Sequence, residues 1–417
     1  MRRMLAALMT AVMIAASAVP CFADEIIEYE KPEIKNSWQA VLYEETTDTY
    51  LYLKNENVNN PPASMTKVMT AMLVLEYDPD LSGTATVSAD AVSYRHCSWM
   101  DDFHLVEGET VSVSELMDYL LIVSANEAAN VLAEYVAGDI ASFVKMMNAK
   151  AAELGMTHTV YHDTHGLSSD NRITCNDMLT LCRYAMQNEK FTEIISKDGG
   201  RLSPNSVRSM PHLYPSYNRC MFPREIEEYK TGFEQDICGI KTGYITESMN
   251  NFSSHMQHGD LSFYGVVMHA HDEQNDAGQW VEYQFADMIT LFRWARSFEL
   301  FKIGREDVLE NVASAKWSRT ANISASPDKE LSALYQSGDL PYSIELKELS
   351  YQVRRGDVIG TITVEDEFGN GGTADLIAVE DCGRNIPVMI TVLAAVVLAA
   401  VLTAVFVSRR KKKKCAE

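Results

Sequence analysis

A serine and a lysine three positions apart are the first residues in this chain whose types and spacing suit chemistry. Ser64 and Lys67 follow a Pro-Pro pair and open the segment 65–77, in which the apolar residues have helical spacing. One helical turn would place both side chains on the same face, so that the lysine amine reaches the serine hydroxyl. A serine hydroxyl is a weak nucleophile at neutral pH and needs an adjacent base, which a partly desolvated lysine can provide. The pair by itself is more typical of a helix cap beside a solvated lysine.

Two further polar clusters follow along the chain. Ser124-Ala125-Asn126 interrupts the helical pattern of residues 112–137 as a polar turn, and Lys241-Thr242-Gly243 ends a strand predicted from Ile237. Taken singly, these are ordinary loop-capping and strand-end residues. Taken together with S-x-x-K, in this order and in these settings, they match the three elements of penicillin-binding proteins and class A β-lactamases.

The chain resembles a low-molecular-mass penicillin-binding protein, a serine-type D-alanyl-D-alanine carboxypeptidase of the peptidase S11 family, over nearly its whole exported length. In the second motif Glu127 stands where that family usually has aspartate. The resemblance is carried by the segments Pro62–Thr70, Ser124–Ala129, Phe143–Gly155, His165–Leu167 and Val353–Gly360.

The resemblance implies a catalytic role for four residues. Ser64 would attack the carbonyl of the D-Ala-D-Ala bond, and Lys67 would take its proton. Ser124 would relay a proton to the leaving amine. Asn126 would either hydrogen-bond the substrate amide or position Lys67. Water would then release the acyl-enzyme, with the loss of one terminal D-alanine.

Four residues of the third motif would bind the substrate. Lys241 and Thr242 would hold the terminal carboxylate of the peptide, a suitable task for a fixed cation and a hydroxyl. The backbone N–H groups of Ser64 and Tyr244 would form the oxyanion hole, and Gly243 would let a substrate strand lie close. After this motif the family usually has threonine two residues on and a small residue with glycine soon after. Here residues 244–251 read Tyr-Ile-Thr-Glu-Ser-Met-Asn-Asn, which bears on the shape of the pocket wall.

Three other functions compete with a carboxypeptidase. A class A β-lactamase needs a carboxylate for its deacylating water, usually in a Glu-x-x-Leu-Asn segment, and the sequence has none. A metal hydrolase is suggested by the runs 162–165 and 269–273, which are rich in His, Asp and Glu, but these short runs look like surface loop or strand-end residues. We therefore predict no metal and no cofactor. A catalytically silent wall-binding protein is favoured only by the atypical segment after Gly243.

The two ends of the chain predict export and membrane anchoring. Residues 1–23 read as a signal peptide, with Arg2 and Arg3 before an apolar run and a small-x-small site ending at Ala23. Cleavage after Ala18 and lipidation of Cys21 are alternatives. Residues 386–407 carry no charge and would span about 33 Å as a helix, which matches a bilayer core. Six basic residues follow within the tail 408–417, so the domains before the span should lie outside the cytoplasmic membrane.

Composition limits the possible partners. The chain has 47% hydrophobic residues, ample for a packed core. Two arginines in the signal, and six basic residues with one glutamate in the tail, leave an exported body with 28 basic and 57 acidic residues, a net charge of −29. A field of this sign excludes nucleic acid as a partner. The expected partners are the peptidoglycan stem peptide, β-lactams as inhibitors, and the cytoplasmic membrane. No disulfide is predicted among the exported cysteines.

The pattern of strands and helices predicts an α+β domain over residues 24–300. It should have a β-lactamase/transpeptidase-like antiparallel sheet, built from 38–43, 49–53, 237–241, 251–256 and 261–269, flanked by helices. Residues 191–228 show little periodicity and are expected to be loops, whereas 278–300 is expected to be one amphipathic helix. Short alternating runs over 301–381 predict a small β-rich domain that precedes the membrane helix.

Overall fold

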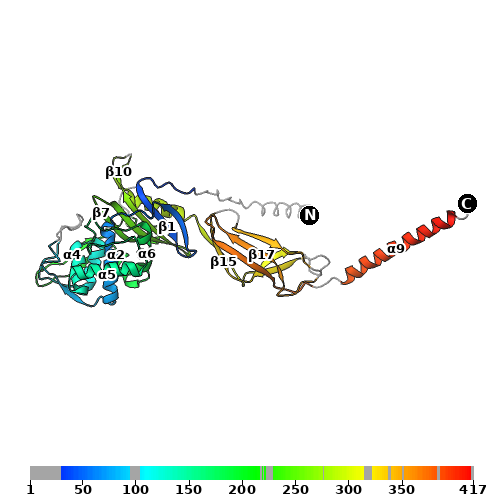
Figure 1. Ribbon diagram of the computed structural model, residues 1–417, viewed down its shortest axis with the longest axis horizontal. Coiled ribbons are helices and arrows are strands. Elements are labelled where there is room, and N and C mark those ends of the chain that lie inside the picture. The colour runs from blue at the N-terminus through cyan, green and yellow to red at the C-terminus, as the bar shows by residue number, and fades with distance from the viewer. Residues whose placement is uncertain are drawn as a thin grey trace, which may run out of the picture.

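The computed structural model describes residues 30–93, 104–216, 218, 220–221, 229–275, 277–313, 322–336, 340–349, 352–382 and 386–414. Side chains of the last helix are described for residues 389–403. The predicted signal peptide, Cys97 and the last three residues of the predicted tail lie outside these ranges. Figure 1 shows a mixed α and β unit, a second unit made of strands, and a final helix in succession along the chain.

A five-stranded antiparallel sheet forms the centre of the first unit, as predicted from its β-prone runs. Its strand order is β2-β1-β9-β8-β7. One edge strand, β2, belongs to the N-terminal hairpin, and the other, β7, carries the third motif. The strands are β1 (Ser37–Glu44), β2 (Thr49–Lys54), β7 (Ile237–Ile245), β8 (Met249–His258) and β9 (Leu261–Ala270).

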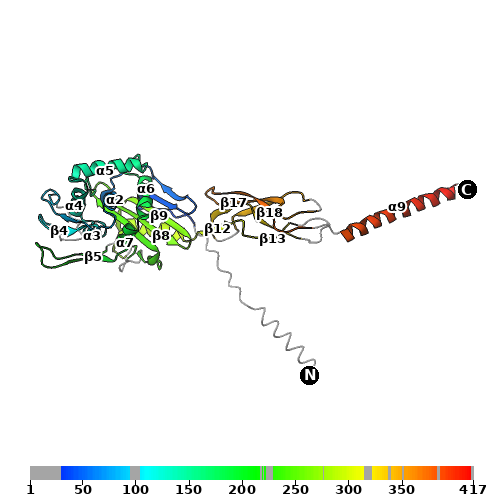
Figure 2. The same cartoon turned by 90° about the horizontal axis from the view of Figure 1, so that it is seen from below.

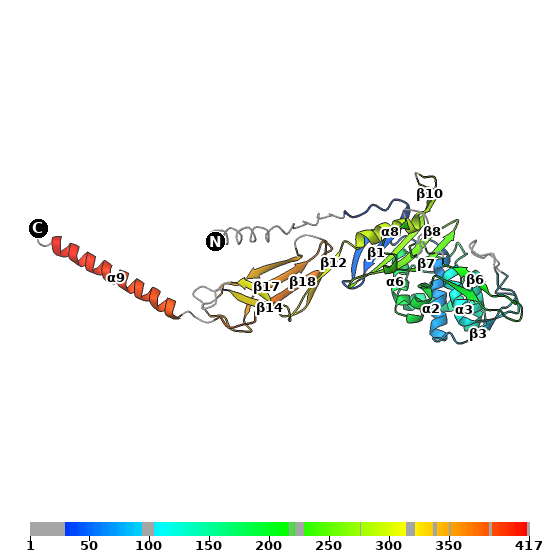
Figure 3. The same ribbon diagram turned by 180° about the vertical axis from the view of Figure 1, so that it is seen from behind.

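Both faces of this sheet are buried. Side chains alternate along each strand, so neighbouring residues belong to the cores on opposite faces. Val41 and Tyr43 of β1 belong to a core shared with the helices on one face, whereas Ala40 and Leu42 pack with α8 on the other. Figure 3 shows α8 on one side of the strands, with α2, α3 and α6 on the opposite side. The helices are α2 (Lys67–Tyr77), α3 (Val113–Asp118), α4 (Asn126–Ala137), α5 (Ile140–Glu153), α6 (Cys175–Met186), α7 (Glu189–Ile195) and α8 (Tyr283–Ala295).

Short antiparallel strand pairs and tight helical turns complete this unit among the described residues. The strand pairs are β3 (Thr84–Thr86) with β4 (Thr110–Ser112), β5 (Gly199–Leu202) with β6 (His212–Pro215), and β10 (Asp272–Gln274) with β11 (Trp280–Glu282). The turns are a 3-10 turn at Ala63–Thr66, a π-helical turn at Tyr119–Val123 and a 3-10 turn at Glu234–Asp236.

Two sequence-based expectations about this unit are wrong. Residues 191–228 are not all loop, because α7 and the β5–β6 hairpin fall within or across them. The helix expected over 278–300 covers only 283–295, since Val281 pairs with β10 as part of β11 and Leu300 belongs to a strand of the second unit. The apolar residues Val281 and Leu300 at the ends of the pattern face the core from strands. Because their spacing happened to continue the helical pattern, the predicted helix was too long.

The second unit is a small β structure, as the alternating runs predicted. A five-stranded sheet has the order β13-β14-β18-β17-β16, and β12 pairs with β15 beside it. Figure 2 shows β12 leading from the first unit into this one. The alternating runs predicted strands at 308–313, 321–325, 342–346, 358–364 and 374–379, so β12 and β15 were not predicted. The strands are β12 (Glu299–Ile303), β13 (Leu309–Ala313), β14 (Ile323–Pro327), β15 (Leu331–Tyr335), β16 (Tyr342–Leu346), β17 (Val358–Glu365) and β18 (Gly371–Ala378).

The two units contact each other at the outer hairpin of the first sheet. Asn370 donates a hydrogen bond to Thr49 Oγ1 at 2.7 Å, and the rings of Phe298 and Phe368 lie 5.6 Å apart. The final helix, α9 (Ile386–Lys414), follows the second unit. Within the described part of the chain, no helix has both the length and the apolar content needed to cross a membrane. The membrane span predicted over 386–407 therefore stays a prediction.

The turn between β7 and β8 contains a residue in the left-handed region. Met249 has a φ of 56°, which costs a residue with a Cβ roughly 1 kcal/mol. We expect Met249→Gly to raise the free energy of unfolding of the exported body by up to about 1 kcal/mol, measured by urea denaturation. Thr246→Gly in the same turn is the control. Thr246 is exposed and has no positive φ, so glycine there should lower stability by about 0.5–1 kcal/mol. Equal effects of the two changes would contradict this interpretation.

Candidate active site

The nucleophile candidate lies in a tight turn that leads directly into α2. Ala63, with a φ of 49°, opens the 3-10 turn Ala63–Thr66, and Lys67 begins the helix. Side chains three residues apart eclipse each other in a 3-10 turn, so Ser64 and Lys67 share a face. Lys67 Nζ lies 2.9 Å from Ser64 Oγ, within hydrogen-bond distance. The contact predicted between the candidate catalytic residues Ser64 and Lys67 is present.

The amine of Lys67 is fully buried and donates to three oxygens. In addition to Ser64 Oγ, it donates to Asn126 Oδ1 at 2.7 Å and to the carbonyl oxygen of His165 at 2.7 Å. An ammonium has three donors and no acceptor, so this set satisfies it when it is protonated. Loss of one proton leaves a lone pair that Ser64 can use. Of the two roles considered for Asn126, the geometry shows the contact with Lys67.

The carbonyl of His165 is held in place by a loop built around one carboxylate. Asp163 accepts hydrogen bonds from the backbone N–H groups of Gly166 at 2.6 Å and Ser168 at 2.6 Å, and from Asn171 at 3.0 Å. Burial raises the pKa of Asp163, but the nearby His165 and these hydrogen bonds outweigh it and hold the pKa below its usual value. Asp163 therefore stays ionised and fixes the loop. The run 162–165 was expected at the surface, but Thr164 and His165 are buried.

The two His-rich runs, 162–165 and 269–273, were weighed above as metal ligands. Across the described ranges, no three His, Cys, Asp or Glu side chains gather in a way that would hold a metal ion. The run 162–165 supplies a backbone acceptor to Lys67 instead. In the sequence, the role of this run was indicated by the resemblance of His165-Gly166-Leu167 to the family. The spacing of its possible metal ligands did not indicate that role.

The second motif begins in an unusual backbone conformation. Ser124 follows the π-helical turn with φ 69° and ψ 32°, and α4 then begins at Asn126. The Ser124 side chain is 7% exposed, and its Oγ has no hydrogen-bond partner among the described residues. A buried hydroxyl without a partner is costly, which is typical of a group whose partner is a substrate. The polar turn predicted here is confirmed.

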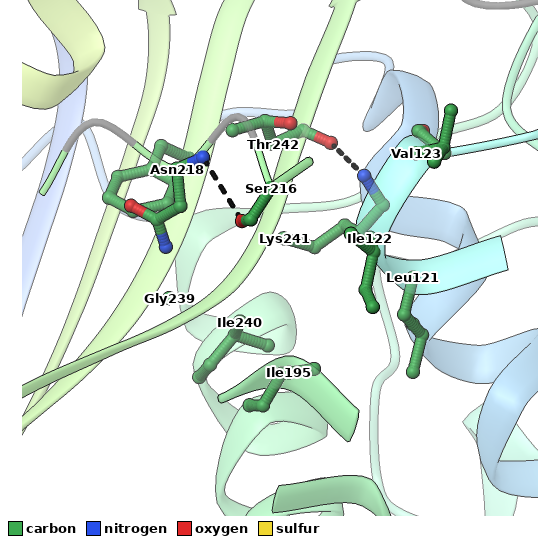
Figure 4. A pocket seen from close by; sticks show the side chains of 12 residues that line it. Leu121, Ile122, Val123, Ile195, Ser216, Asn218, Gly239, Ile240, Lys241 and Thr242 are labelled. Carbon is green, nitrogen blue, oxygen red and sulfur yellow. Dashed lines mark hydrogen bonds between the residues drawn. The ribbon is translucent and has the colours of Figure 1, made fainter. Parts of the chain in front are cut away.

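The third motif lies on the outer strand β7 and faces the second. One pocket is lined by residues of both motifs, among them Ser124, Lys241 and Thr242. Figure 4 shows Lys241 and Thr242 of β7 beside Leu121, Ile122 and Val123, the residues that precede Ser124. Lys241 is 4% exposed, and its Nζ donates to the Thr242 carbonyl at 3.1 Å. Burial lowers the pKa of Lys241 to about 7. A substrate carboxylate in this pocket would favour the charged form.

Gly243 brings β7 against the nucleophile turn. A Cβ at this position would lie 2.7 Å from the Pro62 carbonyl oxygen and 3.0 Å from the backbone nitrogen of Ser64. No larger residue fits without moving the backbone. Tyr244 follows on the same outer strand and is 49% exposed. The free edge of β7, opposite β8, therefore runs beside Ser64. An oxyanion hole made by the backbone N–H groups of Ser64 and Tyr244 would require this arrangement.

The geometry thus combines a serine hydrogen-bonded to the buried amine of Lys67, the hydroxyl of Ser124 without a partner among the described residues, and a basic pocket at Lys241 that can hold an anion. The sequence model of the D-alanyl-D-alanine carboxypeptidase family, peptidase S11, matches residues 27–272, which contain all three motifs. The chain belongs to this family. The fold and enzyme class predicted from the sequence, an S11 carboxypeptidase-type hydrolase with an antiparallel sheet flanked by helices, are confirmed.

Individual relatives of the family cover most of the chain. D-alanyl-D-alanine carboxypeptidase DacF of Bacillus subtilis (strain 168) is 25% identical over 378 residues, 88% of this chain and 91% of the relative. DacC of Escherichia coli (strain K12) is 27% identical over 316 residues, 72% and 73% of the two chains. The crystal structure of DacD from Francisella tularensis shares the fold with a TM-score of 0.59 at 19% identity, and the match covers 87% and 97% of the two chains.

The buried Lys241 predicts a pH dependence for this family member. Below about pH 7 the ammonium form dominates and can hold a substrate carboxylate, and above it the neutral amine loses that attraction. We expect the KM for a peptide with a free carboxyl terminus to rise as the pH increases from about 6 to about 9. Lys241→Arg keeps its charge over this range, so its KM should stay constant with pH even if the value is higher. A wild-type KM that does not change with pH would contradict the assignment.

Proposed function

We propose that this protein removes the terminal D-alanine from peptidoglycan stem pentapeptides through an acyl-enzyme on Ser64, and that β-lactams inhibit it by acylating the same serine. The observation that carries the proposal is the 2.9 Å contact between Lys67 Nζ and Ser64 Oγ. The family assignment supports the same reaction.

The acylation step uses the buried lysine as a general base. Neutral Lys67 takes the proton of Ser64 as Oγ attacks the carbonyl carbon of the penultimate D-alanine. The backbone N–H groups of Ser64 and Tyr244 stabilise the negative charge that develops on the carbonyl oxygen. When the tetrahedral intermediate collapses, the C–N bond breaks and the ester to Ser64 Oγ remains.

The leaving group and the second step use the other side of the pocket. The unpaired hydroxyl of Ser124 donates its proton to the departing amine of the terminal D-alanine and takes in its place the proton that Lys67 received from Ser64. Water then attacks the ester carbonyl and gives a proton to the neutral Lys67, and Lys67 passes that proton to Ser64 Oγ as it leaves. Every group in this sequence comes from the chain, the substrate or water, so the reaction needs no metal and no cofactor.

The carboxylate pocket explains why such an enzyme acts on chain ends. Lys241 and Thr242 line the pocket beside Ser124, and a free carboxylate there offsets the cost of burying the lysine charge. An amide in place of the terminal carboxylate would leave that cation without a partner. The pocket is a local positive site in a body whose net charge is strongly negative.

Labelling and product release test this proposal directly. We expect penicillin treatment of the exported body to add one penicilloyl group to the peptide that contains Ser64, detected by mass spectrometry. Ser64→Ala should show no adduct and should lose release of D-alanine from a pentapeptide by about 10³-fold or more. A labelled protein that releases no D-alanine would indicate a binding or sensing role instead.

The sequence of the C-terminus further supports a cell-surface location. The uncharged segment 386–407 precedes six basic residues, a pattern typical of a single span with the tail in the cytoplasm. We infer that α9 anchors the enzyme in the cytoplasmic membrane and that the signal peptide exports the domains before it. The β unit would then hold the active site away from the bilayer.

Cell fractionation tests the anchor. The full chain should sediment with membranes and resist extraction by high salt, because its attachment is apolar. A chain ending at Asp381 should remain in the aqueous fraction and keep its penicillin labelling. Release of the full chain by salt alone would contradict a membrane span.

A further inference from the structure

A buried amide on β8 contacts both sides of the catalytic turn. Asn251 is completely buried and pairs directly with Gly243 across the β7–β8 ladder. Its Nδ2 donates to the carbonyl oxygen of Pro61 at 3.3 Å, three residues before Ser64. One side chain therefore connects the strand that carries the third motif with the segment that carries the nucleophile.

The remaining polar atoms of this amide are also used. Nδ2 donates a second hydrogen bond to Ser248 Oγ at 3.1 Å, and Oδ1 accepts from the backbone N–H of His269 at 2.9 Å. A carboxylate at this position would lack both donors, and an aliphatic side chain would remove the hydrogen bonds to the Pro61 carbonyl and from the His269 N–H. Few other side chains satisfy this set.

The atypical turn after Gly243 belongs to the same network. Ser248 is fully buried, and its carbonyl oxygen accepts from Asn60 Nδ2 at 3.4 Å. Asn60 in turn exchanges two backbone hydrogen bonds with Ile173, of 2.9 and 3.0 Å. The segment 60–62 is thus held from two sides immediately before the backbone turns sharply at Ala63.

The oxyanion hole explains why this connection matters. Its two N–H donors come from segments far apart in sequence, Ser64 after the Pro-Pro pair and Tyr244 on β7. Their relative position depends on the contact between the segment 61–62 and β7. A displacement of about 1 Å at such a site can reduce a rate by about 10²-fold.

We propose that Asn251 is a positioning residue for catalysis, which sets the nucleophile turn against β7 through Pro61 and so aligns the two oxyanion donors. This inference rests on the proposed function. Asn251 is not itself a catalytic residue, because its contacts are with Pro61, Ser248 and His269. Its loss should slow bond making without weakening the carboxylate pocket at Lys241.

The neighbouring Asn250 provides a matched control. It lies on the same strand, is 7% exposed, and its Nδ2 donates to Asp272 Oδ1 at 2.8 Å and to the Ala270 carbonyl at 3.4 Å. These contacts lie toward β9 and β10, away from the nucleophile turn. Asn250→Leu and Asn251→Leu therefore remove the same amide at a similar depth and differ in the contact with Pro61.

The experiment compares both variants of the exported body with wild type at a temperature where circular dichroism shows all three to be folded. The second-order rate of acylation by a fluorescent penicillin should fall by about 10- to 100-fold in Asn251→Leu and stay within about twofold in Asn250→Leu. For D-alanine release from a pentapeptide, kcat should fall while KM stays within about twofold. If Asn251→Leu does not fold, Asn251→Ser is measured in its place, with the same expectations.

The outcomes separate this inference from the proposed function. Wild-type protein that is not labelled at Ser64 overturns the proposed function and this inference with it. Labelled wild type together with an Asn251 variant that reacts as fast as the Asn250 variant overturns the inference alone. So does a rise in KM with an unchanged kcat, because that result would place the effect in substrate binding.

Discussion

The site depends on one buried amine that must find three oxygen acceptors. A charged ammonium is expensive to remove from water unless hydrogen bonds replace its hydration. Lys67 obtains these bonds from its own turn, from the first residue of α4 and from the loop that Asp163 organises. The structure thus brings together segments near residues 64, 126 and 165. Without this convergence the lysine could not be buried beside the serine, and the serine would lack the base that we propose for it.

The second constraint is the close contact between the nucleophile turn and the outer strand β7. Gly243 allows the contact because it has no Cβ, and Asn251 on the next strand supports it from behind. The turn itself is strained at Ala63, so the packing around it must compensate. A rigid sheet edge is well suited to this task, because hydrogen bonds along the ladder resist small shifts.

Sequence patterns predicted the parts of the fold whose periodicity is long and regular. The central strands around Lys241, Phe252 and Val266 lie in β-prone runs, and the helix after Ser64 has helical spacing of its apolar residues. The pattern failed where elements are short: α7 has seven residues, and β5 has four. Such elements depend on tertiary contacts, as the hydrogen bond between Ser203 Oγ and Glu115 Oε1 beside β5 illustrates.

Local spacing in the sequence by itself determined that Ser64 and Lys67 share a face, and the order of motifs determined the family. Only the tertiary structure decided that Asn126 bonds Lys67, that His165 supplies a carbonyl to it, and that Asn251 holds the nucleophile segment. The physical reason is the separation of the contacting residues along the sequence. A contact within one helical turn follows from backbone geometry, whereas contacts between residues 59 to 190 positions apart exist only after the sheet and helices have packed.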